Sequence, residues 1–76
     1  MEQKIKQDIC IVNNIRRIRK KRGIKQTELA AMLQLKNVSM TREALVKIER
    51  GIQHIQASQL KAIKEVLQTS YEELFK

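Results

Sequence analysis

The chain has 76 residues, of which 16 are Lys or Arg and 8 are Asp or Glu, so its formal net charge is +8 at pH 7. A domain this small buries only about 60% of its unfolded surface, which leaves no room for a deep substrate cavity beside a core. The positive charge favours a polyanionic partner, either nucleic acid or an anionic membrane surface. With one cysteine, no apolar run long enough to span a membrane and no secretory segment, the chain is expected in the cytoplasm.

Apolar residues recur at helical spacing in four segments of the chain. They predict helices over about residues 8–22, 25–33 and 41–50, and a fourth that starts near Ala57. Ser70 and Glu73 form a capping-box pair, which predicts a short fifth helix anchored by Leu74. No segment alternates in the manner of a strand, so we expect an all-α protein. The apolar stripes consist of Ile11, Ile15 and Ile18; Leu29, Ala30 and Leu33; Leu45 and Ile48; and Leu60, Ile63 and Leu67.

Two glycines and a threonine mark helix ends. Gly23 and Gly51 each follow a helical pattern and are expected in the left-handed conformation beyond a helix C-terminus. Thr41 is expected to cap the third helix by accepting a hydrogen bond from a free backbone N–H. We divide the chain into an N-terminal extension over residues 1–10, either frayed or helical, and one domain over residues 11–76.

The third predicted helix, with the sequence TREALVKIERG over residues 41–51, has two different faces. Leu45 and Ile48 fall on the side expected to face a core, a pattern that ordinary surface helices share. The outer side has long polar side chains, and a short helix precedes it in the chain. Two short helices in this order are typical of a helix-turn-helix that reads DNA. The outer side is formed by Arg42, Glu43, Val46, Lys47 and Arg50.

Three segments of the chain resemble the phage-repressor and Cro-like helix-turn-helix proteins, also called the XRE family. They are IRRIRKKRGIKQTELA at 15–30, LVKIERG at 45–51 and LKAIKEVLQTSYEELF at 60–75, in the order that the family has. The resemblance covers about residues 11–75. It implies a compact five-helix bundle of the lambda-repressor-like type that binds double-stranded DNA, needs no cofactor, and regulates transcription, with repression the expected mode.

The resemblance assigns base contacts in the major groove to the outer face of the third helix. Arg42 and Lys47 can donate to guanine, and Glu43 can accept from the amino group of cytosine. The alternative for all three is a solvated charged face. Val46 can touch a thymine methyl group, or it is one of the isolated surface hydrophobes that are normal in proteins.

The start of the second helix is predicted to contact the DNA backbone. Gln26 and Thr27 lie where free N–H groups and the helix dipole attract phosphate, and the family's glutamine at this place also supports the recognition helix. Lys25 departs from the family, which has Ser, Thr or Asn at this position. A lysine side chain cannot accept the capping hydrogen bond, so we expect this helix to lack that contribution. Thr41 and Arg50, at the two ends of the third helix, complete the predicted DNA-binding set.

Charged residues away from the outer face of the third helix have two predicted uses. The resemblance implies a structural ion pair between Arg19 and Glu49, partly shielded from water. A run of cations without an acid is expected to neutralise phosphates with about half of its members and to solubilise the helix with the rest. That run consists of Arg16, Arg17, Arg19, Lys20, Lys21, Arg22 and Lys25.

The connection before the third helix is longer than the family pattern. Residues 34–40 stand between the second stripe and the third helix, whereas the turn of this motif has 3–4 residues. We expect the second helix to end near Lys36 and Asn37 to adopt a left-handed conformation. Val38 or Met40 is expected to pack against the core. This connection decides how the recognition helix enters the groove.

Residues suited to catalysis or metal binding are scattered. His54 is the only histidine and lies in a connection without Cys or carboxylate at ligand spacing. Cys10 has no histidine companion and is expected to be packed or idle. Glu72 and Glu73 are helix-start acids. We therefore expect a protein that is not an enzyme and holds no metal.

The C-terminal segment is the one candidate for a protein partner. The family often dimerises through its last helix, and the implied homodimer interface here consists of Tyr71, Leu74 and Phe75. In the alternatives, Leu74 closes the monomer's own core, or the aromatic residues meet a further segment of a longer chain. Two rival functions remain: a protein-interaction module such as an antitoxin-like neutraliser, and a nonspecific nucleic-acid binder.

Overall fold

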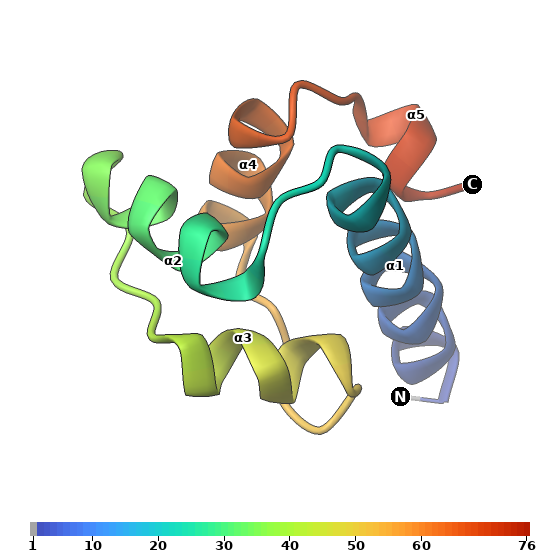
Figure 1. The fold of residues 1–76 in the computed structure, drawn as a ribbon. Helices are drawn as coiled ribbons and strands as arrows, with labels where there is room; N and C mark the ends of the chain where they lie inside the picture. Colours follow the sequence, from blue (N-terminus) through green and yellow to red (C-terminus); the bar gives the residue numbers. More distant parts are fainter. Residues whose placement is uncertain (1) are drawn as a thin grey trace.

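The computed structural model describes the backbone of residues 2–76 and the side chains of residues 10–76, and this part of the chain contains five α-helices and no strand (Figure 1). The expectation of an all-α, five-helix protein is confirmed. Among the described helices, none combines the length and apolar character that crossing a bilayer requires. The helices are α1 (Glu2–Lys21), α2 (Gln26–Leu35), α3 (Arg42–Glu49), α4 (Ala57–Val66) and α5 (Tyr71–Leu74).

Helix α1 starts six residues earlier than the apolar stripe predicts, at Glu2 instead of about Asp8. The first residues, EQKIKQD, are mostly good helix formers, and neither Gly nor Pro interrupts them. Of the two alternatives for the N-terminal extension, the structure has the helical one. The division at residues 10 and 11 stays a prediction, and the backbone helix passes through it without a break.

All five helices contribute to one hydrophobic core, and the predicted stripes supply most of its residues. Helix α3 packs against α1 and α2, while α4 packs against α2 and α5 against α1 (Figure 1). Burying one such leucine or isoleucine contributes about 1.5–3 kcal/mol. The fully buried side chains are Ile15, Leu29, Leu33, Leu45, Ile48, Ile63, Leu67 and Leu74.

The left-handed residues mark the ends of the first four helices. Gly23 (φ 70°), Gly51 (φ 77°) and Asn37 (φ 62°) adopt this conformation, as predicted. Gln68 (φ 54°) does so as well, which the sequence did not indicate, because glutamine has a Cβ that disfavours this region. The N–H groups after α4 bond back to the carbonyl oxygens of Glu65 and Lys64, as in a Schellman motif.

The lengthened connection between α2 and α3 follows the prediction. Helix α2 ends at Leu35, one residue before the expected limit, and Asn37 turns the chain. Both candidate anchors are used, since Met40 is buried and Val38 packs partly buried against the core. Leu35 lies outside the apolar stripe and is 86% exposed.

Candidate nucleic-acid interface

Helix α3 is held by its inner face and presents its outer face to solvent. Thr41 caps it, with Oγ1 accepting a hydrogen bond from the Ala44 N–H at 3.1 Å, as predicted. Leu45 and Ile48 are fully buried. The three residues predicted to meet base edges, Arg42, Glu43 and Lys47, are all exposed.

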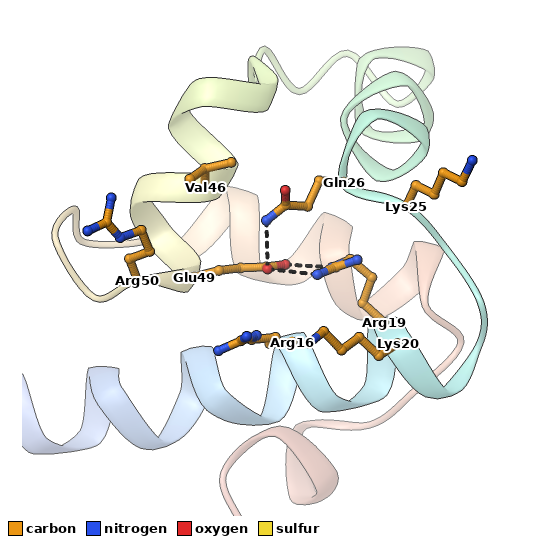
Figure 2. Close-up of a pocket in the computed structure, with 8 residues that line it drawn as sticks. All are labelled: Arg16, Arg19, Lys20, Lys25, Gln26, Val46, Glu49 and Arg50. Atoms are coloured by element: carbon orange, nitrogen blue, oxygen red, sulfur yellow. Dashed lines mark hydrogen bonds and ion pairs between the residues drawn. The ribbon is translucent and has the colours of Figure 1, made fainter.

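The two remaining outer residues of α3, Arg50 and Val46, differ in how far they are exposed. Arg50, a member of the predicted DNA-binding set, is exposed at the C-cap. Val46 was predicted to stand clear of the core, but it is half-buried and forms part of the wall of a hollow (Figure 2). Val46 lines this hollow together with residues of α1 and the start of α2, so the neighbouring helices partly cover it.

The predicted ion pair between Arg19 and Glu49 is formed and ties α1 to the end of α3. Arg19 Nε lies 2.7 Å from Glu49 Oε2, and Arg19 Nη2 lies 2.9 Å from Glu49 Oε1. The side chains are only 8% and 3% exposed, so the pair is more deeply buried than the partial shielding predicted. Arg19 also donates through Nη1 to the Ile24 carbonyl oxygen at 2.8 Å. The bidentate geometry and the extra bond offset the desolvation of the two charges.

Gln26 joins this pair from the start of α2. Its Nε2 donates to Glu49 Oε1 at 3.0 Å, so one carboxylate receives hydrogen bonds from α1 and from α2 (Figure 2). The predicted support of the recognition helix is therefore present as a direct contact. Thr27, the next residue, is exposed on the first turn of α2.

Lys25, which precedes α2, was predicted to lack a capping hydrogen bond from its side chain, and the structure has none there. A different residue contributes to the cap: Glu28 Oε1 accepts a hydrogen bond from the backbone N–H of Lys25 at 2.8 Å. A carboxylate in the first turn also suits the positive end of the helix dipole. This acid three residues downstream compensates in part for the missing Ser, Thr or Asn.

A hollow of ≈ 500 Å³, here called the basic hollow, lies between α1, the start of α2 and the end of α3 (Figure 2). Five of its eight residues are Arg or Lys. The one acid among them, Glu49, is already neutralised by Arg19. The lining residues are Arg16, Arg19, Lys20, Lys25, Gln26, Val46, Glu49 and Arg50.

The fold separates the run of cations between residues 16 and 25 into groups with different surroundings. Arg19 belongs to the buried pair. Arg22 donates to the carbonyl oxygens of Leu67 (2.6 Å from Nε) and Gln68 (2.9 Å from Nη2), at the left-handed turn after α4. The basic hollow receives Arg16, Lys20 and Lys25, whereas Arg17 and Lys21 are exposed outside it.

The three residues of the predicted dimer interface differ in how far they are buried. Leu74 is fully buried in the monomer's own core, so its place in an interface between copies is wrong. Tyr71 and Phe75 are 42% and 55% exposed, and their rings stack with centroids 5.9 Å apart. Ser70 caps α5 by accepting from the Glu73 N–H, while the Glu73 carboxylate pairs with Lys76.

The described side chains were predicted to be scattered with respect to metal binding, and their grouping can be compared with that prediction. No three of the described His, Cys, Asp and Glu residues are grouped so that they could hold a metal ion. Cys10 is exposed, so the packed alternative for its thiol is wrong.

The comparisons with known proteins agree with this geometry. Residues 15–74 match a family model described as helix-turn-helix. The match runs from the last third of α1 to the last residue of α5 and so includes α2, α3 and the connection between them. No curated protein and no solved structure matched the chain significantly.

Proposed function

Because the chain belongs to the helix-turn-helix family of phage-repressor and Cro-like (XRE) DNA-binding regulators, we propose that it represses transcription by reading a specific duplex sequence with α3. The observation that carries the proposal is the outer face of α3, where Arg42, Glu43 and Lys47 are exposed together while Leu45 and Ile48 anchor the helix. A helix fixed in this way can enter the major groove with its polar side chains toward the bases.

Base reading is assigned to Arg42 and Lys47 first, then to Glu43 and Val46. Arginine and lysine are the commonest partners of guanine, and each good base contact is worth about 1–3 kcal/mol of discrimination. Glu43 would accept from a cytosine amino group. Val46, half-buried beside the outer face, would reach a thymine methyl group only where the DNA approaches the wall of the basic hollow.

Backbone contacts are assigned to residues at the ends of the two helices. Gln26 and Thr27 lie in the first turn of α2, Thr41 is the N-cap of α3, and Arg50 is its C-cap. Free backbone N–H groups at helix N-termini and exposed guanidinium groups bind phosphate without reading sequence. These contacts would fix the register in which α3 meets the bases.

Selection of binding sites from random duplex DNA tests the proposal. We expect a defined half-site that Arg42→Ala and Lys47→Ala lose at one or two positions, by about 5- to 150-fold each, in line with the value of a base contact. Lys61→Ala, which removes an exposed lysine from α4, is the matched control and should keep the half-site. Salt-sensitive binding without a consensus would instead support the nonspecific binder.

A second copy of the chain is the proposed partner on DNA, because symmetric dimers place two recognition helices about 34 Å apart, one turn of the duplex. The exposed stacked pair of Tyr71 and Phe75 is the surface that favours it. Sedimentation equilibrium of Phe75→Asp against wild type tests the surface. A wild-type protein that stays monomeric on its selected site would contradict it.

A further inference from the structure

We infer that the basic hollow is a phosphate subsite through which α1 becomes part of the DNA interface, with Arg16 and Lys20 as its contributions. The inference rests on the DNA binding in the proposed function and assigns a contact to a helix outside the two helices of the motif. The ligand class is a phosphodiester or phosphate oxyanion, and the source is the duplex backbone beside the groove that α3 enters.

The positive charge of the basic hollow is the first reason to assign a phosphate to it. Four cations line the hollow without an ion pair among the described residues: Arg16 and Lys20 from α1, Lys25 before α2, and Arg50 after α3. The fifth, Arg19, is neutralised by Glu49, the only acid in the wall. Like charges gathered around a concave surface focus a positive potential into it and attract an anion.

Position is the second reason. Arg16 and Lys20 lie one turn apart on α1, below the Arg19–Glu49 pair, while Lys25 and Arg50 extend from opposite rims (Figure 2). The pair and Gln26 form a hydrogen-bonded floor that joins α1, α2 and α3. A phosphate held here would therefore be held against the same body that carries the base-reading face of α3.

The rest of α1 provides the contrast that makes the inference testable. Arg17 and Lys21 are also exposed and also follow each other by one turn, but they lie outside the hollow. Arg17 has a 3.5 Å contact with Asn14 Oδ1, on the side of α1 where Asn14 reaches the Leu74 carbonyl oxygen of α5. The pair Arg16 and Lys20 and the pair Arg17 and Lys21 thus have equal charge on the same helix. They differ mainly in that only the first pair lines the hollow.

The experiment compares R16Q/K20Q with R17Q/K21Q on a duplex of arbitrary sequence, so that it needs no knowledge of the operator. The slope of log Kobs against log salt concentration counts neutralised phosphates, at about 0.9 for each. We expect R16Q/K20Q to make the negative slope shallower by about 1 to 2 and R17Q/K21Q to leave it within about 0.3 of wild type. Equal changes in the two variants, or no change in either, would overturn the inference.

A second arm separates the source of the phosphate. Inorganic phosphate is titrated into the protein without DNA, and backbone amide NMR shifts are followed at Gln26 and Arg50. Shifts that saturate in wild type and vanish in R16Q/K20Q mean that the hollow takes a free phosphate by itself, whereas a slope change without such shifts assigns it to the duplex. Either result supports the phosphate subsite. Neither measurement depends on a selected half-site, so a failed site selection would contradict the sequence-specific repressor without contradicting the subsite.

Discussion

The ion pair between α1 and α3 is buried and bidentate, whereas the ion pair between the C-cap residue of α2 and helix α4 is exposed and made by a single contact. In the first, Arg19 and Glu49 approach to 2.7 Å with side chains 8% and 3% exposed. In the second, Lys36 and Glu65 are 3.4 Å apart and 47% and 41% exposed. Both bridge helices far apart in the sequence. Their surroundings differ, and the surroundings decide what each contributes to stability.

The difference lies in the cost of losing one partner. A buried charge without its partner keeps its desolvation cost and loses the compensating attraction. An exposed charge without its partner is hydrated by water and screened by salt. The region around Glu49 should therefore respond strongly to single substitutions, and the region around Glu65 weakly.

The largest effect is expected for Arg19→Met or Glu49→Met alone, with a loss of about 3–5 kcal/mol in the free energy of unfolding. Urea denaturation followed by circular dichroism measures it, at low temperature if the single variants are partly unfolded. The double variant Arg19→Met/Glu49→Met should recover much of the loss, because no unpaired charge remains. A single variant that loses less than about 1 kcal/mol would remove the basis of the comparison.

Gln26→Met should lower the free energy of unfolding by about 1.5 kcal/mol, because it keeps the length of the side chain but removes the donor to Glu49. Arg19 still neutralises the carboxylate, so the effect stays well below that of breaking the pair. Gln34→Met, on the exposed side of the same helix, is the control and should change the unfolding free energy by less than about 0.5 kcal/mol. Equal effects of the two variants would mean that the contact does not stabilise the fold.

Arg22 makes one partly buried and one exposed hydrogen bond, and so is intermediate in burial between the buried and the exposed ion pair. Arg22→Met should lower the free energy of unfolding by about 1 kcal/mol. The guanidinium donates to the carbonyl oxygens of Leu67 and Gln68, which are partly buried or exposed, so water can replace part of what is lost. Hydrogen exchange should show the change at the end of α4 and in the turn before α5. Lys21→Met is the control, and an equal loss there would show that general charge removal is responsible.

Features that depend on a single helix or turn could be predicted from the sequence. The apolar stripes give the buried faces of the helices, and Gly23, Gly51 and Asn37 mark turns that their own backbone preferences favour. The outer face of α3 is predicted in the same way, since helical periodicity alone separates Lys47 from Ile48. The buried pair was found only through the family resemblance.

Features that depend on how helices meet could not be predicted. Nothing in the run of cations tells Arg16 from Arg17, because their difference arises only when α3 and the start of α2 enclose a hollow on one side of α1. The left-handed Gln68 gives no signal either, since its turn is held by backbone bonds and by Arg22, 46 residues away in the sequence. Tertiary contact decides these positions.

The smallest effect is expected for the exposed pair. Lys36→Gln and Glu65→Gln should each change the free energy of unfolding by less than about 1 kcal/mol, and a double-mutant cycle should give a coupling of about 0.2–0.5 kcal/mol. At 1 M salt, where the Debye length falls to about 3 Å, that coupling should vanish. The coupling between Arg19 and Glu49 should persist under the same conditions, because water and ions do not reach it. A salt-resistant coupling at Lys36 would mean that the α2–α4 region shields its charges far more than their exposed side chains indicate.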